Sequence, residues 1–253
     1  MLHYEVIIPC YNEEKNLHNT LPQLEHFFTH HYPHRRITFV NDGSKDNTLG
    51  VLTMYKNISK LSINIVSYDT NHGKGYAVKK GISQSKADYT LMMDADLATD
   101  LSMIHNIVHM AEENQASIII GDRTTGISKR SRLRKFLGKG AQRCTKMILG
   151  LGFSDTQAGF KLFHKSSYHL RNQVHIDKWG FDFELLYIAQ KEGITIKTMP
   201  IIRKEQRHSK VTLQSYIDTF DELIKVRYIH SVWYDMQVRL SHTIGSLWGY
   251  LRQ

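Results

Sequence analysis

The sequence predicts an α/β fold in which helices cover both faces of a mostly parallel sheet. Short β-branched and aromatic segments alternate with longer amphipathic ones, and polar clusters follow most of the expected strands. The chain has 253 residues, of which 41% are hydrophobic, so it can bury the core of one large domain. Strands are expected at 4–9, 36–41, 63–67, 89–94 and 117–121, and helices at 13–31, 46–60, 74–86 and 100–114.

Four polar clusters lie where expected strands end. Parallel strands place their carboxyl ends at one edge of the sheet, and ligands bind at that edge in folds of this class. We therefore expect the clusters to form a single site. They are Tyr11-Asn12-Glu13, Asp42-Gly43-Ser44, Asp94-Ala95-Asp96 and Asp122-Arg123.

Asp94 and Asp96 are the expected metal ligands. Residues two apart in an extended segment point to the same side, so both carboxylates face one crevice and repel unless a cation neutralises them. Mg²⁺ or Mn²⁺ meets that need, because it is held by carboxylates, substrate phosphates and water. The alternative is a helix cap near residue 100, a role that Asp100 can fill alone.

The segment Asn71-His72-Gly73-Lys74-Gly75 lies between an expected strand and an expected helix. Its glycines would let the backbone come close to a ligand, and Lys74 with the helix start would supply positive potential for a phosphate. The spacing is not that of a Walker motif. A phosphate contact and an ordinary turn both stay open.

The charge of the chain calls for an anionic partner. The formal net charge is +9, and the stretch from Gly126 to Gly150 contains many Lys and Arg residues but no Asp or Glu. Aromatic residues do not interleave with this basic run as nucleic-acid binding would require, so we expect no nucleic acid. A solvated helix face is the plainer reading of the same stretch.

Two segments have the pattern of helices with one apolar side. Apolar residues recur at helical spacing from Leu133 to Leu151 inside the basic stretch, and again from Leu213 to Leu251 with Trp233 and Trp248. We expect a catalytic domain at 1–212 and a helical tail at 213–253. The tail would lie on an anionic membrane surface, pack on the catalytic domain or form a homodimer contact.

No apolar run approaches the roughly 18 to 20 residues that span a bilayer. The first residues lack the basic start and apolar stretch of a secretory signal. The expected location is therefore the cytoplasm, with peripheral attachment to the cytoplasmic face of the membrane.

Taken in order, the motifs resemble the family 2 glycosyltransferases with the GT-A fold. VIIPCYNEEKNL at 6–17, VNDGSKDNT at 40–48, NHGKGYAVKKGI at 71–82 and DADLATD at 94–100 carry the likeness. SDTQAGFKLF at 154–163 and WGFDFELLYIAQKEG at 179–193 are similar to the branch that glycosylates polyprenyl phosphates. That branch includes the dolichyl-phosphate glucose and mannose synthases.

On the donor side, the resemblance implies a nucleoside pocket, a metal site and a sugar site. Asp42 would contact the base, Asp94 would lie toward the ribose and phosphate, and Asp96 would be the principal metal ligand. Asp155 and Gln157 would line the donor sugar and the metal. The pocket would also include Pro9, Tyr11, Asn12, Glu13 and Lys74.

On the acceptor side, the resemblance implies that Arg123, together with Arg132 or Arg134, holds the phosphate of the lipid. Arg207 and Lys210 would come from a segment that closes on the pyrophosphate. The chain departs from the family pattern at two positions. Ala158 stands where many relatives have Cys, and His208 stands where Gly usually precedes Ser-Lys, which puts the flexibility of the closing segment in doubt.

The expected reaction moves a hexose, glucose from UDP-glucose, onto undecaprenyl or dolichyl phosphate with inversion. A phosphate monoester is already ionised near neutral pH, so no carboxylate base is required. Asp155 is the candidate if a base is used. The alternatives are mannose or N-acetylhexosamine transfer, a saccharide acceptor, or a basic adaptor without catalysis, although an adaptor has no use for Asp94 and Asp96.

Asp182 and Glu184 allow two interpretations. The aromatic and apolar residues around them mark the start of a buried helix, where Asp182 could bond a helix-end amide. Contact with the acceptor or metal region is the competing interpretation.

Overall fold

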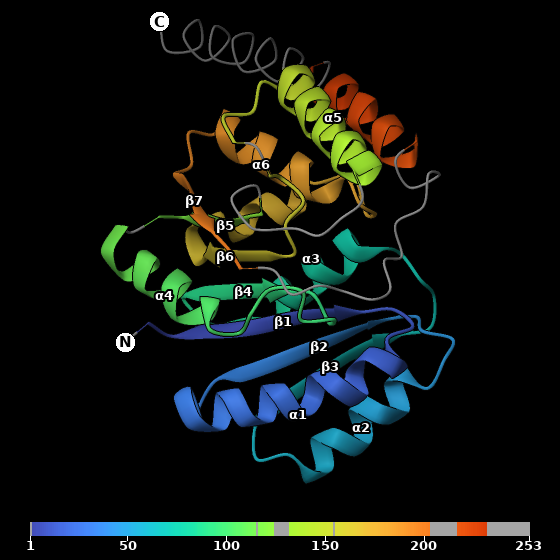
Figure 1. Cartoon of the computed structure of the whole chain (residues 1–253), viewed down its shortest axis with the longest axis vertical. Coiled ribbons are helices and arrows are strands. Elements are labelled where there is room, and N and C mark those ends of the chain that lie inside the picture. Colours follow the sequence, from blue (N-terminus) through green and yellow to red (C-terminus); the bar gives the residue numbers. More distant parts are fainter. Residues whose placement is uncertain (1, 115, 124–131, 154, 203–216, 232–253) are drawn as a thin grey trace, which may run out of the picture.

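The computed structural model describes residues 2–114, 116–123, 132–153, 155–202 and 217–231, with the backbone alone for 114, 132–139 and 141 (Figure 1). The predicted alternation of the first half is confirmed. The elements there are β1 (Tyr4–Cys10), α1 (Glu14–His31), β2 (Arg36–Asp42), α2 (Thr48–Ile58), β3 (Ser62–Tyr68), α3 (Lys74–Gln84), β4 (Tyr89–Met93), α4 (Met103–Asn114) and β5 (Ile118–Asp122).

The second half contains helices where the sequence predicted them, in the basic stretch, around Asp182 and in the tail, together with strands and a 3-10 helix that the periodicity did not predict. The strands β6 and β7 are short, and the segment between β6 and α6 is a 3-10 helix, η1. Residues 217–231 form a further helix. The labelled elements are α5 (Arg132–Leu149), β6 (Phe160–His164), η1 (Lys165–Asn172), α6 (Phe181–Lys191) and β7 (Ile196–Pro200).

The seven strands form one sheet in the order β3-β2-β1-β4-β6-β5-β7. All neighbouring strands are parallel except that β6 runs antiparallel to β4 and β5 on either side of it. The mostly parallel sheet is therefore confirmed, with one inverted strand inserted between β4 and β5. That strand places Lys161 opposite Met92 of β4 and Ile120 of β5.

Helices cover both faces of the sheet, as predicted. Val6 and Ile8 of β1 pack in the same core as the buried side chains of α1 and α4, whereas Ile7, between them, packs with those of α3 and α6. This alternation follows from the two-residue period of a strand. Both faces are buried, which is why the strands read as nearly continuous apolar runs.

A third apolar cluster joins α5, α6 and the helix at 217–231. Leu149, Phe183 and Tyr187 pack there with Leu223 and Val226. Figure 1 shows α5 and the helix at 217–231 side by side above α6. The helix at 217–231 therefore packs on α5 and α6 through one of its sides, while the expected boundary between residues 212 and 213 lies outside the described residues.

Within the described part of the chain, no helix combines the length and hydrophobicity needed to cross a bilayer.

Candidate active site

The carboxyl ends of β1, β2, β4 and β5 bring the predicted polar clusters to one edge of the sheet. These strands are parallel to one another, with only the inverted β6 between β4 and β5. Contacts between the clusters follow from this arrangement.

Asp94 lies at the end of β4 and pairs with Lys74, the first residue of α3. The Lys74 Nζ is 2.6 Å from Asp94 Oδ1. Burial lowers the pKa of Lys74 and raises that of Asp94, but the attraction between the two charges prevails, so the pKa of Lys74 is raised and that of Asp94 is lowered. Both groups therefore stay ionised, and the Asp94 side chain remains 34% exposed.

Asp96 occupies a tight turn after β4. Its Oδ1 accepts a hydrogen bond of 3.0 Å from the Ala98 backbone N–H, and Leu97 N–H donates to the Asp94 carbonyl. Leu97 has a φ of 48°, a left-handed conformation that is unfavourable for a residue with a branched side chain. Asp94 and Asp96 offer carboxylate oxygens only, which is the donor type that Mg²⁺ and Mn²⁺ prefer, so these residues fit the expected metal.

Arg123, just after β5, pairs with Asp155 in a two-pronged arrangement. Its Nε and Nη2 donate to the two carboxylate oxygens at 2.6 Å each, and its backbone N–H donates at 3.0 Å. Burial raises the pKa of Asp155, but Arg123 outweighs it and lowers the pKa below its usual range. With a 1% exposed side chain and a low pKa, Asp155 is poorly suited to take a proton, so these contacts do not favour the predicted use of Asp155 as a catalytic base.

Lys161 and Asp182 form a third ion pair that the sequence analysis missed. Lys161 is the second residue of β6 and is fully buried. Its Nζ donates to Asp182 Oδ1 and to the Ala158 carbonyl at 2.5 Å each. Burial lowers the pKa of Lys161, and the charge of Asp182 opposes that effect. A lysine inside the apolar strand Phe160–His164 is the signal that could have revealed this pair.

Asp42 ties the end of β2 to the loop at 71–73. Its carboxylate accepts hydrogen bonds from Asn71 Nδ2 at 2.8 Å, His72 N at 2.8 Å and Gly73 N at 2.9 Å. Asp42 is 2% exposed, so the contact with a base that the resemblance implies would have to form alongside these bonds.

Gly73 and Gly75 make room for protein atoms. A β-carbon on Gly73, whose φ is 108°, would lie 2.6 Å from the carbonyl oxygen of Asp177, and one on Gly75 would lie 2.5 Å from Phe181 Cβ. The glycines therefore allow the start of α3 to pack against the segment before α6 and its first turn. Close approach of a ligand is not needed to explain them.

Further residues that the resemblance assigns to the nucleoside pocket lie at and after the carboxyl end of β1. Pro9 is half-buried near the end of β1, and Tyr11 is exposed. Asn12 has a φ of 51°, and its Oδ1 accepts from Lys45 N at 2.8 Å. The backbone N–H of Glu13 donates to Thr48 Oγ1 at 2.8 Å. These bonds hold the loop after β1 against the loop after β2.

Glu184 has a structural environment. It is buried in α6, and its oxygens accept from the backbone N–H groups of His175 and Ile176 and face His230 Nε2 at 2.7 Å. Together with the Lys161 contact of Asp182, this favours a structural role for both acidic residues of α6.

Some expected site residues fall outside these contacts. Gln157 is half-buried in the described chain. Arg207 and Lys210 lie outside the described residues, as do the side chains of Arg132 and Arg134 at the start of α5.

The sequence profile of "Glycosyl transferase family 2" matches residues 5–170. The chain belongs to this family. The matched range contains the turn with Asp94 and Asp96 and the ion pairs Lys74–Asp94 and Arg123–Asp155. It also contains Lys161, whose partner Asp182 lies beyond it. The chain is therefore a glycosyltransferase, and the adaptor alternative is excluded.

Curated relatives extend the similarity beyond that range. The chain is 33% identical over 250 residues to a dolichyl-phosphate beta-glucosyltransferase of Dictyostelium discoideum, a match that covers 92% of this chain and 76% of the relative. It is 32% identical over 258 residues to the human dolichyl-phosphate beta-glucosyltransferase, covering 92% and 78%.

Solved structures share the fold at low identity. Mannosyl-3-phosphoglycerate synthase from Rubrobacter xylanophilus superposes with a TM-score of 0.69 at 15% identity, covering 93% of this chain and 75% of that one. Glucosyl-3-phosphoglycerate synthase from Mycobacterium tuberculosis, in a complex with Mn²⁺, UDP-glucose and phosphoglyceric acid, gives a TM-score of 0.62 at 13% identity, with 89% and 80% covered. The GT-A fold expected from the motifs is thus confirmed.

Proposed function

We propose that this glycosyltransferase moves glucose from UDP-glucose onto dolichyl phosphate or a related polyprenyl phosphate and inverts the anomeric configuration. The observation that carries the proposal is the match to dolichyl-phosphate beta-glucosyltransferases over 92% of the chain. An α-linked donor would give the β-linked product that those names describe.

The donor half of the site would be the edge around Asp94 and Asp96. Departure of a nucleoside diphosphate leaves negative charge on the leaving group, and fixed positive groups that meet this charge contribute most to catalysis. We propose that Asp96 and Asp94 hold Mg²⁺ or Mn²⁺, which would supply Lewis-acid stabilisation of the diphosphate. Lys74 lies within 2.6 Å of Asp94 and adds a second cation at this position.

The acceptor half would be centred on Arg123. A guanidinium has five N–H donors, and only its Nε and Nη2 contact Asp155, so others can bind an acceptor phosphate. The Arg123 side chain is 29% exposed, whereas Asp155 is buried behind it. Asp155 would then orient the guanidinium and take no proton. The acceptor needs no base, because a phosphate monoester with a second pKa of about 6 is largely ionised at neutral pH.

We further propose that the chain reaches its lipid from the membrane surface. The helix at 217–231 buries Leu223 and Val226 against the core. Its opposite side exposes an outer stripe at helical spacing, and Met147 of α5 is also exposed. An apolar stripe on a helix that packs beside the basic helix α5 suits an anionic headgroup layer. The stripe consists of Ile217, Phe220, Ile224 and Tyr228.

The decisive experiment incubates the full chain with radiolabelled UDP-glucose, GDP-mannose or UDP-N-acetylglucosamine and with dolichyl or undecaprenyl phosphate. We expect label in the lipid fraction with UDP-glucose, a β-linked product by NMR, and loss of transfer in EDTA that Mn²⁺ restores. Label from another donor would replace glucose in the proposal. Transfer to a saccharide alone would overturn the lipid acceptor.

A further inference from the structure

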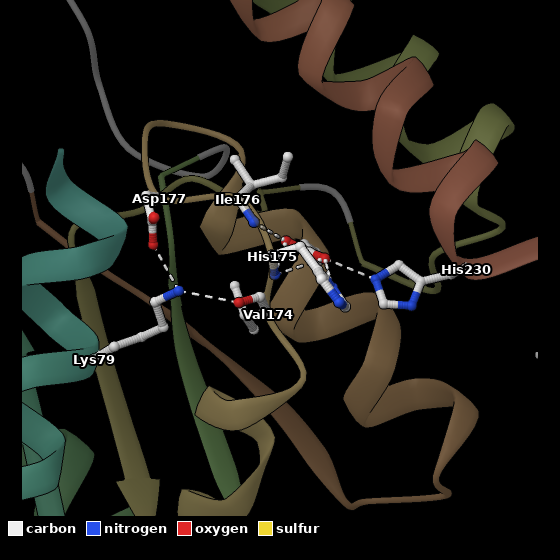
Figure 2. A network of polar contacts seen from close by, with 7 residues as sticks. Lys79, Val174, His175, Ile176, Asp177 and His230 are labelled. Atoms are coloured by element: carbon white, nitrogen blue, oxygen red, sulfur yellow. Dashed lines mark hydrogen bonds and ion pairs between the residues drawn. The ribbon is translucent and has the colours of Figure 1, made fainter. Parts of the chain in front are cut away.

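Three segments far apart in the sequence bring metal-binding side chains together beside α6. Glu184 lies in α6. His175 follows η1, and His230 lies in the helix at 217–231 (Figure 2). One ligand atom from each lies within 4.8 Å of the others. Neither Asp94 nor Asp96 belongs to this group.

The spacing of the ligand atoms suits a small transition-metal ion. Glu184 Oε1 is 2.7 Å from His230 Nε2 and 3.3 Å from His175 Nδ1. Four-coordinate Zn²⁺ has bonds of about 2.0 to 2.2 Å, which separates its ligand atoms by about 3.4 Å. The separation of His175 Nδ1 and Glu184 Oε1 is already close to this value. His230 Nε2 would have to move away from Glu184 Oε1 by less than one bond length.

The carboxylate between the histidines is already oriented. His175 N donates to both oxygens of Glu184 at 3.1 Å, and Ile176 N donates to Oε2 at 2.7 Å, while Oε1 faces the two imidazoles. Lys79 of α3 in turn holds the loop by donating to the Val174 carbonyl at 3.0 Å and pairing with Asp177 at 2.6 Å (Figure 2). Such outer contacts fix first-sphere ligands and strengthen metal binding.

Access and donor type also agree with a metal site. Glu184 is fully buried, whereas the His175 side chain is 50% exposed, so an ion can enter from the His175 side. Two imidazole nitrogens and one carboxylate oxygen are ligands for Zn²⁺ and its neighbours in the transition series, whereas Mg²⁺ takes oxygen ligands.

We propose that His175, Glu184 and His230 bind one Zn²⁺ ion or a similar transition-metal ion, with water in the fourth position. Binding releases the proton between His230 Nε2 and Glu184 Oε1 to water and replaces their hydrogen bond with two metal bonds. The ion would link the helix at 217–231 to α6 and to the loop after η1. This site is chemically separate from the proposed Mg²⁺ or Mn²⁺ site, and its test does not depend on sugar transfer.

The test measures the thermal unfolding of the full chain with Zn²⁺ or Mg²⁺ alone. A ligand that binds only the folded state raises Tm, and saturation with Zn²⁺ should raise it by about 5 °C, whereas Mg²⁺ should not. Co²⁺ should give the visible absorption of a four-coordinate ion at one equivalent per chain, and Zn²⁺ should abolish it. The absence of a Zn²⁺ effect on Tm would overturn the proposal.

The chain has fifteen histidines, so variants are needed to distinguish Zn²⁺ binding at this site from Zn²⁺ binding at other histidines. His175→Ala changes a half-exposed side chain and should remove the Zn²⁺ effect. His230→Gln should also remove it, because the imidazole ligand is lost. The glutamine amide can still donate to Glu184, so the hydrogen bond between the two helices is kept. The matched control is His169→Ala, because His169 forms an exposed pair with Glu192 at 2.8 Å, to which the described residues add no third metal-binding side chain. An equal Zn²⁺ effect in all three variants would assign binding to surface histidines and overturn the proposal.

Discussion

Asp94 and Gly159 lie so close that a β-carbon on Gly159 would be 1.7 Å from Asp94 Oδ2. Asp94 N–H also donates to the Gly159 carbonyl at 3.1 Å. The inverted strand β6 begins directly after Gly159, so the insertion of this strand between β4 and β5 determines how Asp94 is presented.

Gly159→Ala should therefore displace the Asp94 carboxylate and break its contact with Lys74. We expect transfer to fall by about 100-fold, the loss typical of removing one charge-stabilising group, while the fold is kept. Steady-state transfer assays and circular dichroism measure the two effects.

Gly152→Ala is the matched control, since a β-carbon there would meet only Gln190 Oε1, at 3.9 Å. This variant should transfer at close to the normal rate. Normal activity in Gly159→Ala would show that the position of Asp94 is not needed for transfer.

Asp96→Asn tests charge at the proposed metal site. The asparagine oxygen can still accept from Ala98 N, so the turn is kept and only the negative charge is lost. We expect transfer to fall by about 100-fold or more at saturating Mn²⁺. Asp100→Asn is the control, because Asp100 makes the same kind of contact with Ser102 N at 2.9 Å. Equal activities of the two variants would refute Asp96 as a metal ligand.

The Lys161 and Asp182 pair should behave as a buried ion pair. Lys161→Met leaves Asp182 buried without its partner and should lower the free energy of unfolding by about 3 kcal/mol or more. The double change Lys161→Met with Asp182→Leu should recover most of that loss, because it removes both charges. Urea unfolding of the single and double variants gives the coupling, and additive effects would contradict the prediction.

Glu25 of α1 should make stability depend on pH. Burial raises its pKa, but hydrogen bonds from Ser59, Tyr55 and the Lys60 N–H outweigh burial and lower the pKa below its ordinary value. The stabilisation is full above the unfolded pKa of about 4.3 and disappears as the pH falls through the folded value.

Glu25→Gln should therefore be less stable than the natural chain at about pH 7, and the difference should shrink toward about pH 3. Urea midpoints at the two pH values measure it. Glu113→Gln, on the exposed surface of α4, matches the change in charge and should show a smaller difference. A difference for Glu25→Gln that is constant with pH would be inconsistent with the lowered pKa.

The outer stripe of the helix at 217–231 should bind lipid. Phe220→Asp with Ile224→Asp should release the chain from sedimenting vesicles of phosphatidylcholine and phosphatidylserine, because both side chains are about half exposed and face away from the core. The control pair is Met54→Asp with Ile58→Asp, since these α2 side chains are also apolar and even more exposed, at the opposite end of the molecule (Figure 1). Equal sedimentation of both pairs would remove this helix from the membrane contact.

Local sequence patterns determined most of the fold and one edge of the site. The period of apolar residues located the elements from β1 to β5, because alternation along a strand or helix reflects which side is buried. The rule that parallel strands share a carboxyl edge then placed Asp42, Asp94 and Arg123 at the same edge of the sheet.

Tertiary structure alone decided which partner each charged group found. Lys161 meets Asp182 because β6 is inverted and inserted next to β4, and strand order is not encoded in a local period. His230 meets Glu184 across 46 residues. The apolar residues of the C-terminal helix were evident as a pattern, but only packing assigned Leu223 and Val226 to the core and left Phe220 and Ile224 exposed. The local spacing of residues predicts which side chains will be buried. The ion-pair or packing partner of each side chain depends on how elements distant in the sequence come together.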